Sequence, residues 1–306
     1  MTPLRWFALL LGLLAVALVP TQMKSYGVYL ATLWCVYLIA GMGLNLTVGY
    51  AGQISLGQAA FLGLGAYTAA ILAKAGVPYI AILPTAALLC FVVGLLLGFP
   101  ALRVQHHYLA FATLGFNVLV FLMLRNEEWL TGGTFGLNNI PRPVLFGWRF
   151  NRALDFYQLT FAMLLVMAAL MALLLRSPWG RAFAALRDNP IRAESVGVNT
   201  TFYTLMAFAI GAAYGGIAGV FFAALVQFIE PAPFNVSTSL AMLLMVIVGG
   251  SGRFFGPALG AMIIVLLPEW LRFAADWYLA VFGFLIVVMM VWLPGGLLSL
   301  PERLRR

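Results

Sequence analysis

Apolar runs of about 20 residues recur along almost the whole chain, and they limit its possible folds more than any other feature. A helix needs roughly 20 apolar residues to cross a hydrocarbon core of about 30 Å. Hydrophobic residues make up 64% of the 306 residues and charged residues only 8%, whereas about a quarter of a soluble domain is charged. The sequence therefore predicts an all-α, polytopic membrane protein.

Polar breaks divide the chain into about ten predicted spans within a single transmembrane domain, residues 1–306. The first run resembles a secretory signal, but no convincing cleavage site follows it, so we expect a retained helix. The eighth run is short enough to be re-entrant. The spans lie at about 5–20, 27–49, 53–74, 79–99, 107–125, 156–176, 203–229, 236–250, 255–272 and 277–298.

Lysine and arginine residues predict which side of the membrane each loop faces. With the N-terminus inside, ten of them fall on the inner side and seven on the outer side, and an excess of basic residues is typical of cytoplasmic loops. We therefore expect both termini in the cytoplasm. The two longest loops then face opposite sides: about 126–155 outside and about 177–202 in the cytoplasm. These short basic loops account for the net charge of +8 without nucleic-acid binding.

The cytoplasmic loop contains a short segment with helix-capping signals at both ends. Asn189 is a favourable N-cap, and Pro190 suits the first helical position. Gly197 tolerates the left-handed conformation that ends many helices. A helix of about two turns, PIRAESV, is thus predicted. From spacing alone it either closes a turn, with Arg187 and Arg192 solvated, or docks onto a partner.

Glycines occur in the predicted spans in two patterns. Gly211, Gly215 and Gly219 repeat every fourth residue, which places them on one helix face and predicts close helix packing. The glycines of GYAGQISLGQ are irregular and mixed with amides, and non-helical backbone at membrane depth must be buried in protein or line a cavity. We expect a hinge or gate there; a packed turn and a substrate site are the alternatives. The gate residues are Asn45, Gly49, Gly52, Gln53, Ser55 and Gln58.

Chemistry-bearing residues are sparse. Glu269 is expected to pair with Arg272, three residues on. No cluster of histidines, cysteines and carboxylates predicts a metal site or a catalytic centre, and the nucleotide-binding pattern G-x-x-x-x-G-K-[ST] does not occur. We therefore expect a chain that is not an enzyme and binds no cofactor itself. VGYAG (48–52) and VGGSG (248–252) resemble each other, but five residues are too few to distinguish a repeat from chance.

Several segments together resemble one family. They are GYAGQISLGQAAFLGLGAY, TGGTFGL with IPRP, SPWGRAFAALRDNPIRAESVGVN, VGGSGRFFGPALGA and LPGGL, from about residue 43 to residue 297. As a set they are similar to permease subunits of ATP-binding cassette (ABC) importers of the branched-chain amino acid, or LivM, type. The same superfamily includes urea-type permeases.

This resemblance implies that the 190–197 helix is the coupling helix that contacts the ATPase. Arg187, Arg192 and Glu194 would supply polar contacts, and Ile191 and Val196 would seat the apolar face. The full set is Arg187, Asn189, Pro190, Ile191, Arg192, Glu194, Val196 and Gly197. Only the glycine and part of the Ala/Glu pattern of the family's Glu-Ala-Ala loop remain here.

The resemblance also implies the partners. They are two cytoplasmic ABC ATPases that bind ATP and Mg, a second homologous permease, and a periplasmic or lipid-anchored substrate-binding protein, at the bacterial inner membrane. Alternating access for branched-chain, hydrophobic amino acids is expected. Urea or short amides are alternative substrates. An ion-coupled secondary transporter is a further alternative, but it usually carries several intramembrane Asp, Glu or His residues, and only Glu269 is available.

Overall fold

A computed structural model describes residues 19–101, 108–145, 147–270, 283–284 and 296–299. The predicted span at 5–20 lies almost wholly outside these residues. Most of the predicted span at 277–298 and the side chain of Arg272 lie outside them too.

The long helices follow the predicted spans, and most of their ends fall within about three residues of the predicted ones. The main exception is the third span, which begins at Gln58 because the preceding residues 51–57 are not helical. The helices are α2 (Ser25–Asn45), α3 (Gln58–Lys74), α4 (Tyr79–Ala101), α5 (Tyr108–Asn126), α7 (Ala153–Arg176), α10 (Thr200–Val226), α11 (Val236–Gly250) and α12 (Gly256–Trp270).

Not every predicted span is long enough to cross a membrane by itself. Among the described residues, five helical stretches meet this requirement: Ser25–Tyr50, Tyr79–Pro100, Leu109–Asn126, Ala153–Arg176 and Thr200–Val226. Helix α11 has 15 residues, which at 1.5 Å per residue is about 22 Å, short of a core of roughly 30 Å. The protein is therefore a polytopic helical membrane protein in which α11 does not span the core alone.

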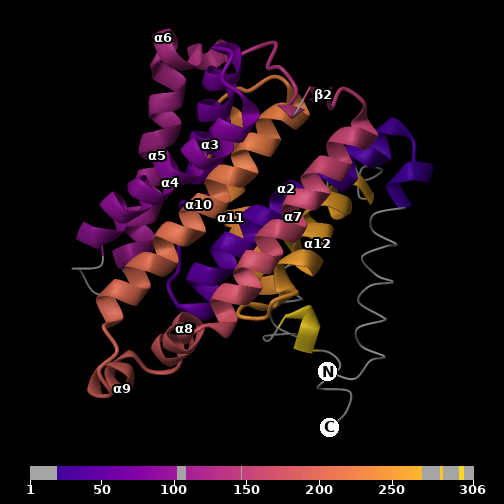
Figure 1. Cartoon of the computed structure of the whole chain (residues 1–306). Helices are drawn as coiled ribbons and strands as arrows, with labels where there is room; N and C mark the ends of the chain where they lie inside the picture. Colours follow the sequence, from indigo (N-terminus) through magenta and orange to yellow (C-terminus); the bar gives the residue numbers. More distant parts are fainter. Residues whose placement is uncertain (1–18, 102–107, 146, 271–282, 285–295, 300–306) are drawn as a thin grey trace.

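Short elements connect these helices at the two ends of the bundle. Helix α6 and strand β2 lie at one end in Figure 1, and α8 and α9 lie at the opposite end. The two long loops thus lie at opposite ends, as their predicted positions require. The short elements are η1 (Val19–Gln22), the π-helical turn η2 (Leu46–Tyr50), α6 (Glu128–Thr131), η3 (Gly133–Phe135), the antiparallel strands β1 (Val144–Leu145) and β2 (Trp148–Arg149), α8 (Pro178–Asp188), α9 (Pro190–Ser195), η4 (Ala232–Phe234) and η6 (Leu297–Ser299).

Helix α10 runs through the middle of the bundle and packs on α2, α3 and α4 (Figure 1). Its glycine face allows backbone-to-backbone contact. A Cβ atom on Gly219 would lie 2.1 Å from the carbonyl oxygen of Leu62, and one on Gly211 would lie 2.7 Å from that of Gly43. A Cβ on Gly215 would lie 2.9 Å from the Cβ of Phe61. Because lipid provides little hydrophobic drive for helix association, such close approach is what holds these helices together.

A polar contact joins α2 to α12 near the start of α2. The hydroxyl of Tyr26 donates a hydrogen bond of 2.7 Å to Oε2 of Glu269. Glu269, whose expected partner Arg272 lies outside the described residues, therefore has a partner on a different helix.

Candidate functional site

Helix α8 was not predicted from the sequence, although its start carries clear signals. Ser177 caps it by accepting a hydrogen bond of 3.2 Å from the Trp179 amide, and Pro178 occupies the first helical position. Phe183 and Leu186 are buried. The Trp179 and Phe183 rings pack edge-to-face on Tyr203 of α10, with centroids 5.6 Å and 6.1 Å away. Helix α8 is thus docked on the start of α10.

Helix α9 has the caps that the sequence predicted, and it is one residue shorter than expected. The Asn189 side chain accepts a hydrogen bond of 3.0 Å from the Arg192 amide, and Pro190 begins the helix. Gly197 has a φ of +85°. The amides of Gly197 and Val198 donate to the carbonyls of Glu194 and Ala193, which is the Schellman pattern of helix ends.

The side chains of α9 divide into one that packs inward and several that face outward. Ala193 is buried, whereas Ile191 is 80% exposed and Val196 is 76% exposed. Arg192 and Glu194 are also exposed, and Glu194 accepts a hydrogen bond of 3.2 Å from the Thr200 hydroxyl. The ends of the α9 backbone are therefore capped within the chain, while the large apolar side chains of Ile191 and Val196 stay exposed.

Arg187, at the end of α8, contacts the chain itself. A Cβ on Gly52 would lie 3.5 Å from the Arg187 Cα, and one on Gly252 would lie 1.8 Å from its Nη1 atom. Gly52 and Gly252 both have positive φ, at +69° and +73°. The sequence suggested only a solvated or docking role for Arg187. In the structure it bridges α8 to two glycine turns of the bundle.

The gate residues lie in and beside an irregular connection between α2 and α3, in which Gly52 is exposed and the other five gate residues are buried. The π-helical turn η2 extends α2, and residues 51–57 follow in a non-helical conformation. The amide of Gln53 donates to the Thr47 carbonyl at 2.9 Å, and the amide of Leu56 donates to the Thr113 hydroxyl of α5 at 2.9 Å. Neighbouring elements thus satisfy backbone groups that a helix would otherwise satisfy.

Asn45 joins this connection to the turn between α11 and α12. Its Nδ2 donates to the Arg253 carbonyl at 3.0 Å, and its Oδ1 accepts from the Gly252 amide at 2.8 Å. A Cβ on Gly49 would lie 2.2 Å from the Gly252 nitrogen. VGYAG and VGGSG therefore lie against each other, although 200 residues separate them in the sequence.

The remaining gate side chains are mostly occupied by contacts within the chain. Buried Gln58 donates to the carbonyls of Ala40 in α2 and Gly211 in α10, at 2.9 Å and 3.3 Å. Gln53 and Ser55 are also buried. The Gln53 side chain donates to the Ala51 carbonyl, and the Ser55 hydroxyl accepts from the Gly57 amide. These contacts make the connection a tie between helices, and they leave little free hydrogen-bonding capacity for a ligand.

One buried amide nearby is not fully satisfied. Asn117 of α5 accepts a bond of 3.3 Å from Ser239, whose hydroxyl oxygen in turn accepts from the Ala59 amide at 2.9 Å. The Asn117 Nδ2 atom is buried and has no partner among the described residues. Asn117 and Thr113 lie four residues apart, on one face of α5, and both adjoin the start of α3.

The contacts among α8, α9 and the connection between α2 and α3 suit the transmission of movement between these elements rather than catalysis. Within the part of the chain that the structure describes, no three His, Cys, Asp or Glu residues are grouped to hold a metal. Arg187 instead connects the end of α8 to the turn at exposed Gly52, in the connection between α2 and α3.

Comparison with known proteins identifies the family. Residues 26–293 match the family described as "Branched-chain amino acid transport system / permease component". The chain belongs to this family. It is 38% identical to the "High-affinity branched-chain amino acid transport system permease protein LivM" of Salmonella typhimurium strain LT2, over 95% of this chain and 74% of that protein. The protein of the same name from Escherichia coli strain K12 gives the same figures.

A more distant relative carries a different printed substrate. The "Autoinducer 2 import system permease protein LsrC" of Salmonella paratyphi B is 26% identical, over 97% of this chain and 88% of that protein. No solved structure matches the chain. The matched proteins are transport permeases, so this chain is a membrane permease component and not an enzyme.

Proposed function

We propose that the chain carries branched-chain amino acids across the bacterial inner membrane by alternating access, as one permease subunit of an ABC importer. Its partners are two cytoplasmic ATPases that bind ATP and Mg, a second homologous permease, and a periplasmic or lipid-anchored substrate-binding protein. In this arrangement both chain termini and α9 face the cytoplasm, and the 126–155 loop faces the binding protein.

The observation that carries the proposal is the surface of α9. Exposed apolar side chains gain free energy when a partner covers them, about 25 cal/mol per Å² of apolar area removed from water. Ile191 and Val196 offer such area on a helix whose own backbone is capped at both ends. An ATPase that docks there would pull on α8, and Arg187 would transmit that movement to the connection between α2 and α3.

The gate role follows from the same geometry. Residues 46–57 contact α5, α8 and the turn between α11 and α12, so a shift of α8 changes contacts on several sides at once. Irregular membrane backbone that separates two helices is the kind of element that changes conformation in transporters. We therefore assign gating to Asn45, Gly49, Gly52, Gln53, Ser55 and Gln58.

Uptake into proteoliposomes tests the proposal. The chain is reconstituted with its ATPases, second permease and binding protein, and uptake of labelled leucine is compared with uptake of urea and autoinducer 2. The expected result is leucine uptake that requires ATP hydrolysis. Uptake of urea or autoinducer 2 in place of leucine would overturn the substrate assignment. Uptake driven by an ion gradient without ATP would overturn the ABC mechanism.

A further inference from the structure

A cavity at the end of the bundle that bears the 126–155 loop has features that the transport role has not yet explained. It has a volume of about 220 Å³ and lies between the first eight residues of α2, the first turn of α7 and the last turn of α10. This is smaller than the roughly 300–1,000 Å³ of sites for drug-sized ligands, so it suits a small molecule. Its lining residues are Ser25, Tyr29, Thr32, Arg142, Ala153, Phe156 and Leu225.

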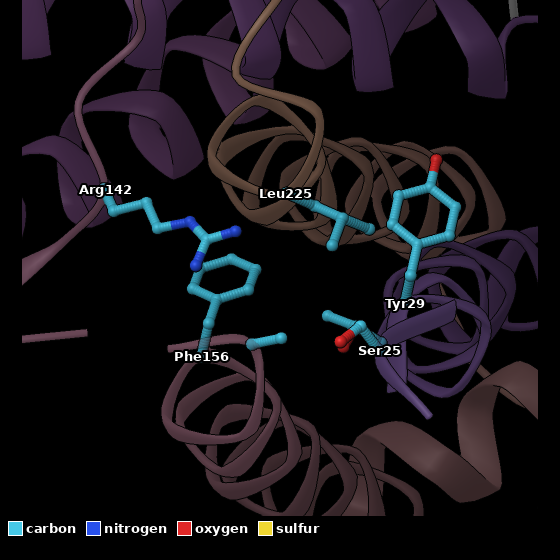
Figure 2. Close-up of a pocket in the computed structure, with 7 residues that line it drawn as sticks. Ser25, Tyr29, Arg142, Phe156 and Leu225 are labelled. Carbon is cyan, nitrogen blue, oxygen red and sulfur yellow. The ribbon is translucent and has the colours of Figure 1, made fainter. Parts of the chain in front are cut away.

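Arg142 supplies the charge of this cavity. Figure 2 shows its guanidinium group reaching over the Phe156 ring into the space bounded by Ser25 and Leu225. The guanidinium carbon lies 5.8 Å from the ring centroid, and Nη1 donates to the Asn151 carbonyl. Both of these partners are neutral. The Nε atom is buried and has no hydrogen-bond partner among the described residues, and leaving a buried donor unpaired is unfavourable.

The backbone holds this arginine in place. Arg142 stands between Pro141 and Pro143 in the IPRP motif, and a residue that precedes proline is restricted to extended conformations. Two residues earlier, buried Ile140 donates its amide to the Gln227 carbonyl at 3.1 Å, just beyond the end of α10. The backbone of Arg142 is thus fixed, and the Asn151 carbonyl and the Phe156 ring hold its guanidinium group. A site that is preorganised in this way binds with a smaller entropic cost.

The neighbouring helix ends add to the positive potential. Helices α2 and α7 begin at Ser25 and Ala153, which both line the cavity. Helix N-termini carry a partial positive charge and favour anions. Lys24 and Arg152 occupy the N-cap positions of these two helices, and neither side chain caps the helix. Asp155, in the first turn of α7, and Glu269, which accepts a hydrogen bond from Tyr26 in the first turn of α2, partly offset this charge.

From this geometry we propose that the cavity binds the carboxylate group of the amino acid that the permease carries. Arg142 would bind the carboxylate, and the apolar wall formed by Ala153, Phe156 and Leu225 would contact the aliphatic side chain. Planar guanidinium matches a carboxylate with two parallel hydrogen bonds. This inference rests on the proposed function, because it takes the transported amino acid as the occupant.

The test is equilibrium binding of labelled leucine to the full chain in nanodiscs of the zwitterionic lipid phosphatidylcholine. We expect Arg142→Gln to weaken leucine binding at least tenfold. The matched control is Arg149→Gln, which removes the same charge from exposed β2 of the same loop, and it should change binding less than twofold. Leucinamide, which lacks the carboxylate, should compete at least tenfold more weakly than leucine.

A second variant covers the case in which Arg142→Gln does not fold. Leu225→Phe leaves the arginine and its loop contacts in place but adds volume at the cavity wall, and it should also weaken leucine binding. Wild-type affinity in both Arg142→Gln and Leu225→Phe would overturn the proposal. A second pair of results would also overturn it. If leucine and leucinamide bind equally, and phosphatidylglycerol in the nanodisc competes with leucine in the wild type but not in Arg142→Gln, the site belongs to a lipid phosphate.

The uptake assay distinguishes failure of the cavity assignment from failure of the proposed function. If the reconstituted transporter takes up leucine with ATP but the two variants bind it normally, only the cavity assignment fails. If leucine uptake is absent with ATP in the wild type, the proposed function itself fails.

Discussion

Helices α10 and α9 are close neighbours in the sequence, but they meet their surroundings in opposite ways. Most of α10 is buried, and its glycines touch the backbones of α2 and α3. In α9 only Ala193 is buried, while Ile191 stands exposed. The apolar surface of α10 is therefore explained by contacts within the chain. The exposed apolar side chains of α9 have no such cover among the described residues, and we propose that a partner covers them. The predictions below test this contrast.

The largest expected effect is on the glycine face of α10. Gly219→Leu places a side chain where even a Cβ would lie 2.1 Å from the backbone of Leu62. Because backbone cannot move aside as a side-chain end can, we expect the free energy of unfolding to fall by more than about 3 kcal/mol. Thermal unfolding in mild detergent measures this.

The matched control for that substitution is Gly115→Leu in α5, where no atom of the described residues lies within 4 Å of an added Cβ. Leucine is a better helix former than glycine, so this variant should be as stable as the wild type or more stable by up to about 1 kcal/mol. Equal losses in the two variants would show that the close contacts of α10 do not hold the bundle together.

A smaller loss is expected at Asn45. Asn45→Ala removes the acceptor of the Gly252 amide and one of two donors to the Arg253 carbonyl, which still accepts from the Gly256 amide. The loss should cost about 1–3 kcal/mol. Thr85→Ala is the control, because the Thr85 hydroxyl donates to the Ala81 carbonyl of its own helix and ties no distant turn among the described residues. Unfolding midpoints that shift equally in both variants would argue against Asn45 as a tie between distant turns.

The α10 glycines, the α9 caps and Asn45 show which features the sequence could predict and which it could not. The glycine spacing of α10 predicted a packing face because it depends only on helix periodicity. The caps of α9 were predictable from Asn189, Pro190 and Gly197, since capping is local. The bonds of Asn45 were not, because they join residues more than 200 positions apart, and no single-sequence pattern encodes such a pairing.

The two errors in the predicted helices, the absence of α8 and the early start of the third span, have physical reasons too. Helix α8 begins with Ser177 and Pro178, signals that the same capping rules would have found. The early start predicted for the third span was wrong because apolar residues in buried, irregular backbone give the same hydropathy as those in a helix. The functional roles of α9 and of the gate residues remain predictions, since neither a helix cap nor a buried amide specifies a partner.

A local effect is expected at the end of α9. Gly197→Ala forces a side chain into a left-handed conformation, at φ +85°, which should cost about 1–2 kcal/mol and loosen α9 without disturbing the bundle. Faster hydrogen exchange of the backbone amides at positions 197 and 198 would report it. Gly76→Ala has a comparable φ of +80° and equally open space at the turn between α3 and α4, so it should leave α9 unchanged.

Substitution of Ile191 should have the smallest effect on stability. It is also the most direct test of whether an ATPase docks on α9. The measurement is co-purification of the co-expressed P-loop ATPase with wild type, Ile191→Glu and Trp148→Glu. Trp148 is 78% exposed at the opposite end of the bundle, so both substitutions should change stability by less than about 0.5 kcal/mol. We predict that the wild type and Trp148→Glu retain the ATPase and that Ile191→Glu loses it while remaining folded. Full ATPase recovery with folded Ile191→Glu would contradict the docking role of α9.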